Sequence, residues 1–378
     1  MKIAQHRWTP TTSWTPPLAG SSAPRAGLVL MFGGTAALKD PALFAQVQRA
    51  YPGAYLFGCS TAGEIHGTQV LVDAVVVTAA SFASSEVRGA RVRLADVPHG
   101  AAAGERLARA LPAKGLVHVV ALSDGLGVNG NDLVRGLTEH LPDGVSVTGA
   151  LAGDGTRFQE TLVIAGAAPE PGVVGVLGFY GSRLRVGYGS LGGFDPFGPE
   201  RLVTRSVGTV LYELDGQPAL QLYKRYLGEH AAGLPGTAFQ FPLKLRTGQG
   251  DAGVVRTVLA INEQDQSLTF AGDLPEGSYV ELTRTNFEHL IDGAVGAAQK
   301  SYEPLGAPPE LALLFTCVGR KIVLGQRTEE EVEGVREVLG EGAALTGFYS
   351  YGELAPFKTG ERCQLHNQTM SVTAFREV

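Results

Sequence analysis

Cysteine and charged side chains are both scarce in this sequence. Its three cysteines are too few to form the set of disulfide bonds that stabilises a secreted fold, and their odd number favours a reducing compartment. The 31 basic side chains are outnumbered by 37 acidic ones, which argues against a protein that holds nucleic acid by neutralising phosphates. The chain has no apolar run of about 18 residues, and no signal-like run precedes Gly27. These absences predict a cytoplasmic protein with no membrane insertion and no nucleic-acid partner.

Glycine, in contrast, is present in excess. The 51 glycines do not follow the three-residue period of collagen, so that class is excluded. A hydrophobic fraction of 44% also excludes a disordered chain. The length of 378 residues is enough for more than one domain with its own core. We therefore expect the glycines to serve as turns within an ordered fold.

The glycines recur in a repeated unit. Three segments begin at Leu28, Leu116 and Leu311, and each reads as strand, loop, amphipathic helix, strand and strand. In every copy the second strand stops at a glycine-bounded turn that carries an acid. These turns are residues 58–64, 149–154 and 347–353, with Glu64, Asp154 and Glu353 as their acids. Alternating strands and helices predict an α/β fold.

A mostly β stretch separates the second copy from the third. Strand-like runs lie between residues 173 and 188 and between 254 and 282, with turns at 263–266 and 274–277. Helices are expected at 218–227 and 286–298. These inserts predict mixed rather than purely parallel sheets. In the third copy, Thr328 and Glu331 have the spacing of a capping box at a helix start.

The predicted architecture has two domains with mixed β-sheets flanked by helices, built from a repeated β-α-β-(Gly turn)-β unit. An extended leader covers residues 1–27. The first domain covers 28–199 and the second 200–378, with the boundary in the Gly/Pro-rich segment 189–199.

Three motifs resemble reactive or binding sites, but each lacks a part. Gly125-x-Gly127-x-x-Gly130 is dinucleotide-like, yet no acid ends the following strand. The turn that holds Cys59 has its second glycine one place too late for a nucleophile elbow. Cys363-x-x-His366 is a single pair, and zinc needs three or four ligands. We predict no catalytic and no metal-binding residues here, while Cys59 stays open as a structural cysteine, a ligand contact or a nucleophile.

The acids of the three turns form a more informative set. In α/β sheets ligands bind at the carboxyl ends of strands, and glycine turns let a ligand reach the backbone. Asp124 and Arg320 lie at the ends of first strands in two of the copies. Carboxylates match an ammonium group and Arg320 matches a carboxylate, so the set suits an amino-acid-like zwitterion. The alternative is that these acids accept hydrogen bonds from their own turns.

These motifs carry a resemblance to a known family. Gly58-Cys59-Ser60-Thr61-Ala62-Gly63-Glu64-Ile65 resembles the signature of the FIST N-terminal domain, as do Ser123-Asp124-Gly125-Leu126 and Gly149-x3-Gly153-Asp154. The run 211–219, Leu-Tyr-Glu-Leu-Asp-Gly-Gln-Pro-Ala, looks like the start of the FIST C-terminal domain. Its end is matched by Cys317-Val318-Gly319-Arg320, by residues 347–353 and by His366-Asn367-Gln368-Thr369-Met370. The resemblance runs from about Leu28 to the C-terminus.

The resemblance implies a prokaryotic sensory protein. FIST domains recur beside histidine kinases, chemoreceptor domains and cyclic-dinucleotide enzymes, and are proposed to bind small ligands such as amino acids. Because the two FIST halves use the whole chain, we expect it to stand alone and to signal through a separate partner such as a histidine kinase. The expected ligand is a small polar, amino-acid-like metabolite, and the sequence sets no oligomeric state. The predicted ligand-binding residues are Glu64, Asp124, Asp154, Arg320, Tyr349, Glu353, His366 and Asn367.

Two alternatives to a cofactor-free sensor stay open. Some members of the family bind haem and sense nitric oxide, which implies a histidine such as His366 as the haem ligand. A hydrolase or transferase would use Cys59, Cys317 or a carboxylate in the cleft of the glycine turns.

Overall fold

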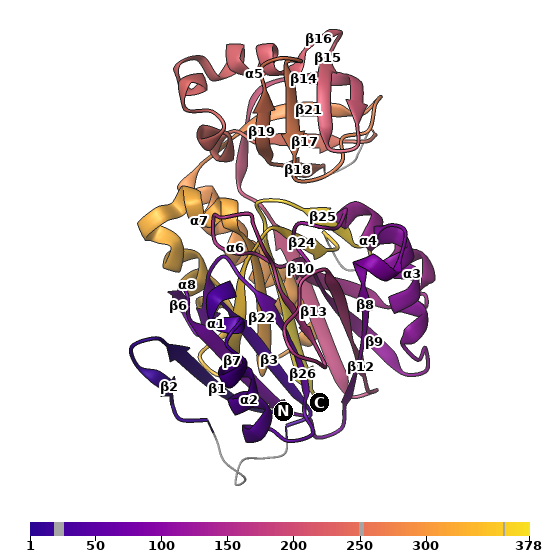
Figure 1. Ribbon diagram of the computed structural model, residues 1–378, viewed down its shortest axis with the longest axis vertical. Coiled ribbons are helices and arrows are strands. Elements are labelled where there is room, and N and C mark those ends of the chain that lie inside the picture. The colour runs from indigo at the N-terminus through magenta and orange to yellow at the C-terminus, as the bar shows by residue number, and fades with distance from the viewer. Residues whose placement is uncertain (19–25, 249–252, 358–359) are drawn as a thin grey trace.

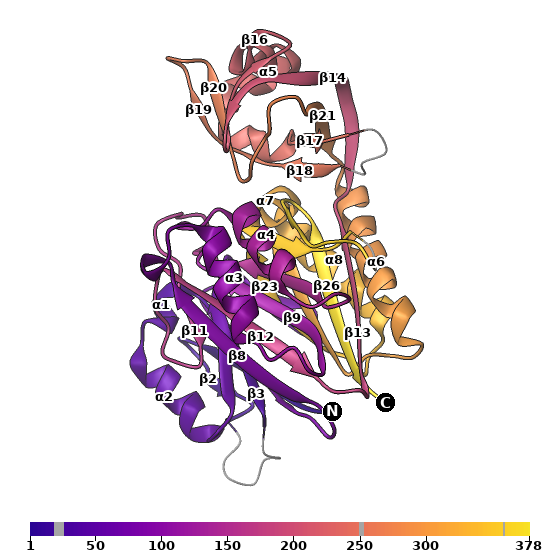
Figure 2. The same cartoon turned by 90° about the vertical axis from the view of Figure 1, so that its right-hand side faces the viewer.

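The chain is divided between a body made of three sheets and a head made of one (Figure 1). The computed structural model describes residues 1–18, 26–248, 253–357 and 360–378. We call residues 194–285 the head and the remaining described residues the body. The chain enters the head after β13 (Leu184–Leu191) through β14 (Phe194–Val207), as Figure 2 shows. It returns to the body at the start of α6 (Phe287–Tyr302).

Each copy of the repeat forms the centre of one six-stranded body sheet, in which two parallel strands are flanked by an antiparallel one. The first sheet has the order β11 (Val163–Ala165), β4 (Tyr55–Ser60), β3 (Leu28–Gly33), β7 (Val75–Ser81), β1 (Lys2–Thr9), β2 (Ser13–Thr15). The second has β25 (Gln364–His366), β24 (Gly352–Ala355), β10 (Ser146–Leu151), β9 (Leu116–Ser123), β12 (Val173–Tyr180), β8 (Glu86–Arg93). The third has β13, β26 (Met370–Glu377), β22 (Leu311–Cys317), β23 (Ala344–Ser350), β5 (Glu64–His66), β6 (Gln69–Leu71).

The three body sheets share one inner core, and helices cover their outer faces. Alternate residues of β3 point to opposite sides, as the strand period requires. Leu30 and Phe32 join an inner cluster with Phe179 and Phe315 from the other sheets, and Met31 packs outward under α2. The helices of the body are α1 (Thr35–Leu38), α2 (Pro41–Ala50), α3 (Gly100–Ala110), α4 (Gly130–His140), α6, α7 (Val318–Leu324) and α8 (Thr328–Leu339). Helices α3 and α4 cover the second sheet, and α6 and α8 cover the third.

After its glycine turn, each copy gives a short strand to the sheet of another copy. Strand β5 of the first copy pairs with β23 of the third. Strand β24 of the third pairs with β10 of the second, and β11 of the second pairs with β4 of the first. The exchange is therefore cyclic and ties the three sheets together at their glycine turns.

In its described residues, the head is an antiparallel sheet with one α-helix. Its strands are β18 (Val254–Arg256), β17 (Leu243–Arg246), β21 (Tyr279–Thr285), β14, β15 (Val210–Leu214), β20 (Ser267–Phe270) and β19 (Val258–Asn262), with β16 (Gln217–Pro218) beside β15. Helix α5 (Ala219–Leu227) packs against it, and the 3-10 turn Gly236–Gln240 lies nearby. The two predicted turns are present, but the predicted meander is wrong. Of the strands expected to form it, only β19 and β20 pair with each other, since β21 lies between β14 and β17 and β18 pairs with β17.

The predicted fold class, with mixed sheets flanked by helices, is confirmed. Gly228 ends α5 at φ 55°, and Asn286 caps α6, close to the predicted bounds. The predicted capping box is wrong: the Thr328 hydroxyl donates to the Gly325 carbonyl, and Glu331 turns inward to a buried arginine. The predicted leader contains β1 and β2, and β1 pairs along its length with β7. Leader residues 19–25 lie outside the described residues.

Within the described part of the chain, no helix combines the length and apolarity needed to cross a membrane.

Candidate functional site

The three glycine turns meet at the end of the body that faces the head. The Gly153 N–H donates to the Ser60 carbonyl at 2.9 Å, which joins the second turn to the first. Ala62 and Tyr349 join the first turn to the third, since the Ala62 N–H donates to the Tyr349 carbonyl at 2.8 Å. Backbone hydrogen bonds between the copies therefore bring the three glycine turns together.

A charged cavity of about 480 Å³ opens at this meeting point, and we call it the turn cavity. All three copies contribute to it. It is lined by Thr61, Ala62, Gly63, Glu64, Val72, Asp73, Gly155, Thr156, Arg157, Val318, Lys321, Ile322 and Gly325.

Two of its charged side chains are held inside and two lie at the mouth. Glu64 is buried and accepts hydrogen bonds from the Thr61 hydroxyl at 2.5 Å and the Ala74 N–H at 3.2 Å. Burial raises the pKa of Glu64 to about 7. Lys321 donates to the Ala62 carbonyl at 2.7 Å, and burial lowers its pKa although Glu64 and Asp73 act to raise it. Asp73 and Arg157 are exposed.

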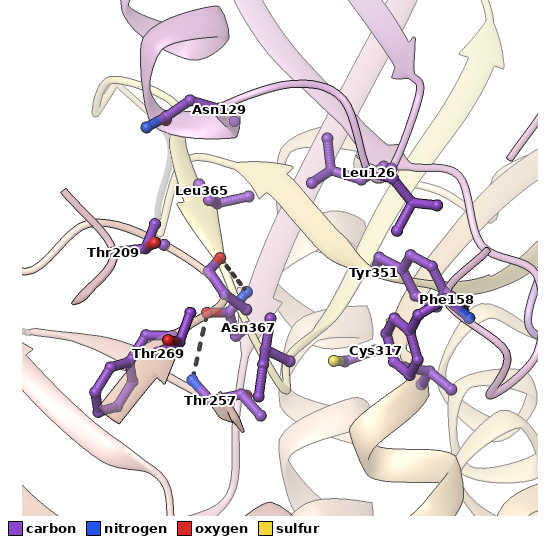
Figure 3. Close-up of a pocket in the computed structure, with 18 of the residues that line it drawn as sticks. Leu126, Asn129, Phe158, Thr209, Thr257, Thr269, Cys317, Tyr351, Leu365 and Asn367 are labelled. Carbon is purple, nitrogen blue, oxygen red and sulfur yellow. Dashed lines mark hydrogen bonds between the residues drawn. The ribbon is translucent and has the colours of Figure 1, made fainter. Parts of the chain in front are cut away.

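A second cavity, of about 290 Å³, lies between body and head, and we call it the junction cavity (Figure 3). None of its lining residues is charged. From the body it is lined by Gly125, Leu126, Val128, Asn129, Gly130, Leu151, Phe158, Cys317, Val318, Tyr351, Leu365 and Asn367. From the head it is lined by Thr209, Phe239, Thr257, Leu259, Thr269, Phe270, Ala271 and Gly272.

Of the eight predicted ligand-binding residues, Glu64 lines the turn cavity and Asn367 lines the junction cavity. Asn367 bridges the two parts, because its amide donates to the Ala271 carbonyl at 3.3 Å and accepts from the Thr257 N–H at 3.5 Å. The other six line neither cavity, and the prediction that they contact a ligand stays a prediction.

Asp124 and Asp154 accept hydrogen bonds from their own turns. The carboxylate of Asp124 accepts from the N–H groups of Leu126 and Gly127. That of Asp154 accepts from the N–H groups of residues 158–160 and from the Tyr351 hydroxyl. Burial acts to raise the pKa of Asp154, but these hydrogen bonds outweigh it and lower the pKa. Both acids thus fix the turns that shape the cavities.

Arg320 and Tyr349 contact the same buried carboxylate. The Arg320 guanidinium donates to Glu331, and the Tyr349 hydroxyl donates to the other oxygen of Glu331 at 2.7 Å. Arg320 Nη2 also donates to the Leu290 carbonyl at 2.6 Å, so the group joins α6, α7 and α8. Lys321, the next residue, is thereby held at the turn cavity.

Glu353 and His366 are buried next to each other in neighbouring strands. Glu353 accepts from the Ser350 hydroxyl at 2.6 Å and from the Thr369 N–H at 3.1 Å, and burial raises its pKa to about 8. His366 Nε2 lies 2.8 Å from the Ala355 carbonyl. The His366 ring has no exposed surface, so its surroundings do not fit a haem ligand, and we derive no chemistry from haem.

Sequence reasoning missed three charged residues of the turn cavity: Asp73, Arg157 and Lys321. Lys321 directly follows the recognised Cys317–Arg320 motif, and a helix begins at Val318 where a loop was expected. Arg157 follows the second glycine turn by a few residues. Within the described residues, no group of three His, Cys, Asp or Glu side chains could hold a metal ion.

Comparison with known proteins agrees with these motifs. The sequence model of the FIST N domain matches residues 27–217, and that of the FIST C domain matches residues 219–356. The chain therefore belongs to the FIST family, whose domains are associated with sensory signalling and small-ligand binding.

The relatives with curated sequences are uncharacterized. One, from Mycobacterium tuberculosis, is 28% identical over 356 residues and spans 88% of this chain and 86% of its own. Another, from Methanocaldococcus jannaschii, is 29% identical over 174 residues, 42% of this chain and 33% of its own. A crystal structure of cyanuric acid hydrolase from A. caulinodans aligns over 78% of this chain and 99% of its own, at 12% identity and a TM-score of 0.19. That score carries no argument about fold or function.

Proposed function

We propose that this protein is a sensor that binds a small polar, amino-acid-like metabolite in the turn cavity. The observation that carries the proposal is the placement of two acids and two bases around one cavity: Glu64, Asp73, Arg157 and Lys321. A zwitterion needs both signs, since its ammonium group pairs with carboxylates and its carboxylate pairs with cations.

The interior pair suits the polar end of such a ligand. Lys321 is a half-buried cation whose ammonium also lies 5.6 Å from the centre of the Tyr349 ring. Glu64 faces the same space and is buried, so an ammonium group beside it would be desolvated and strongly attracted.

A ligand there would contact all three copies of the repeat at once. Thr61–Glu64 belong to the first copy, Gly155–Arg157 to the second and Val318–Gly325 to the third. Binding would therefore stabilise the body by mass action on the folded state.

We propose that the signal passes to a separate cytoplasmic partner such as a histidine kinase. Two apolar side chains at the mouth, Val72 and Ile322, are 64% and 40% exposed and could contact that partner.

A thermal-shift screen of the twenty free amino acids tests the ligand. At least one should raise the melting temperature in proportion to the logarithm of its concentration. Lys321→Met and Asp73→Asn should abolish or weaken the shift; asparagine tolerates the positive φ of 55° at position 73. Lys39→Met and Asp143→Asn, exposed and outside both cavities, are the matched controls. No shift with any amino acid, or equal shifts in all four variants, would reject the proposal.

One observation favours a second candidate function. Glu64 is a buried carboxyl in a cavity with a pKa near 7, which is the property of a general acid–base group in a hydrolase or transferase. Release of 4-nitroaniline from amino-acid 4-nitroanilides, lost in Glu64→Gln, would establish this candidate. The thiol version has no such support, because burial raises the pKa of both Cys59 and Cys317.

A further inference from the structure

The junction cavity differs in chemistry from the turn cavity and needs a different ligand. Its walls hold four aromatic rings, Phe158, Phe239, Phe270 and Tyr351, and no charged side chain. A charged molecule enclosed there would lose hydration without an ionic partner. Cavities of this size with apolar walls and few polar groups are typical of small-molecule sites.

The rim of the cavity exposes apolar surface. Leu126, Phe158 and Leu259 are 43%, 40% and 41% exposed, and all three line the cavity. They come from both sides of the junction, the first two from the body and Leu259 from the head. Large apolar side chains that gather at one opening in this way mark a binding surface more than isolated ones do.

The aromatic wall on the body side is fixed in place. Phe158 stacks on Tyr351 with ring centres 4.4 Å apart and planes 16° apart. Its backbone has φ 53°, a conformation that is strained for a bulky residue. Two hydrogen bonds stabilise this conformation, because the Phe158 N–H donates to Asp154 at 2.8 Å and to the Tyr351 hydroxyl at 3.3 Å. The chain thus maintains an unfavourable backbone conformation that places a flat ring at the cavity.

The polar groups that remain available are neutral. The hydroxyls of Thr209 and Thr269, on the head side, are half-buried and make no hydrogen bond to the described part of the chain. The third hydroxyl, of Thr257, already accepts from the Gln368 amide at 3.0 Å. In Figure 3 Thr209 and Thr269 lie on one side of the pocket, and the Phe158 and Tyr351 rings lie on the other.

We propose that the junction cavity binds an uncharged, flat aromatic molecule, which stacks near Phe158 and hydrogen-bonds to the hydroxyls of Thr209 and Thr269. Such a ligand would contact head and body together. It would add to the direct hydrogen bonds that join the two parts, which include Arg256 Nη1 to the Leu365 carbonyl at 3.0 Å and Asn129 to Asp273 at 3.0 Å. The ligand would therefore hold the head against the body. This inference does not rest on the amino-acid site.

The uncharged fluorescent probe N-phenyl-1-naphthylamine tests the site, since its emission rises and shifts to the blue in apolar surroundings. We expect saturable enhancement with the full chain at micromolar probe. Thr269→Trp, which fills the cavity, should weaken binding at least tenfold. Leu259→Asp, which adds a charge at a partly exposed position, should do the same. Val207→Trp is the matched control, because residue 207 is 70% exposed on the head and lies outside the cavity.

Absence of enhancement with the wild-type chain would overturn the proposal. So would undiminished binding in the two cavity variants, since the probe would then lie elsewhere. The anionic analogue 8-anilinonaphthalene-1-sulfonate should bind at least tenfold more weakly than the neutral probe, and equal or tighter binding would contradict an uncharged site. Amino-acid shifts should persist in Thr269→Trp, so failure at one cavity is distinguishable from failure at the other.

Discussion

Arg320 and Glu331 form an ion pair in which neither side chain has exposed surface. Nε and Nη2 of Arg320 lie 2.9 and 2.7 Å from the same oxygen of Glu331. Burying two charges is costly, and the pair is tolerated because further hydrogen bonds from Tyr349 and to Leu290 satisfy both groups. The pair therefore fixes the relative positions of α7 and α8 behind the turn cavity.

Removing one partner of this pair should be strongly destabilising. Arg320→Met leaves the Glu331 carboxylate buried without a cation, which costs about 3–5 kcal/mol of unfolding free energy. Urea denaturation followed by circular dichroism measures the loss. Arg327→Met, which removes a partly exposed arginine paired with Glu288 and Glu330, should cost much less. The double variant Arg320→Met/Glu331→Leu should recover much of the stability, and a failure to recover would mean that the arginine acts by some other contact.

A glycine at the same point of each copy should tolerate no side chain. A Cβ atom on Gly58, Gly149 or Gly347 would lie 1.8–1.9 Å from the carbonyl oxygen of its partner in the neighbouring parallel strand. Gly347→Ala should therefore force the strands apart and lower the unfolding free energy by about 3 kcal/mol or more. Gly342→Ala is the control, because nothing lies within 4 Å of its Cβ position. Equal melting temperatures for the two variants would contradict the packing argument.

Stability should fall as pH rises through the titration of Glu353. Its pKa is about 8 in the folded chain and near 4.5 when unfolded, so the folded state binds the extra proton between these values. The contribution of this proton to the unfolding free energy is fully present below pH 4.5 and is lost as pH passes 8. Between these values the unfolding free energy falls by up to about 1.4 kcal/mol per pH unit. Glu353→Gln should flatten this slope in urea denaturation at pH 5 to 8, whereas the exposed Glu333→Gln should not. Parallel curves for wild type and Glu353→Gln would contradict the assignment.

Binding of an amino acid should release a proton from Glu64. At pH 6 this carboxyl is mostly protonated, because its pKa is about 7, and an ammonium group beside it favours the ionised form. Calorimetry in buffers of different ionisation enthalpy should detect close to one proton released per ligand. Glu64→Gln should release none, and a release that survives this substitution must come from another group.

The three cysteines should react slowly with iodoacetamide near neutral pH. Cys59, Cys317 and Cys363 are all buried, and burial raises the pKa of each thiol. Little thiolate is therefore present to attack the reagent. Mass spectrometry should show almost no labelling of the native protein within minutes, and three labels per chain after unfolding in guanidinium. Rapid modification of one cysteine alone would revive the nucleophile hypothesis.

Much of the fold could be predicted because its signals are local. The apolar runs of β3, β9 and β22, the amphipathic helices and the glycine turns all lie within short windows of sequence. The exchange of strands could not be predicted, because β5 has three residues and its partner β23 lies about 280 residues away in the chain. Pairing over that distance leaves no periodic signal in either segment.

The candidate site was predicted only in part, because some of its residues belong to local motifs and others are brought together by long-range packing. Glu64 follows a recognisable turn, so its placement in a cavity could be anticipated. Glu331 fitted a capping box equally well, and only the packing of α8 against α7 turns it toward Arg320. The head–body junction brings Thr269 and Phe158 together from distant segments that show no common motif.

The cyclic exchange of strands has a consequence for the order in which the body can assemble. During synthesis, β5 and β10 emerge long before β23 and β24, the strands that pair with them. The second sheet therefore waits with an open edge at β10, and β5 waits without its partner strand, until the third copy is made. Contacts of such long range favour slow folding. A ribosome-bound chain that ends at residue 217, the limit of the FIST N match, still lacks both partners. The body is thus completed by its last-made segment.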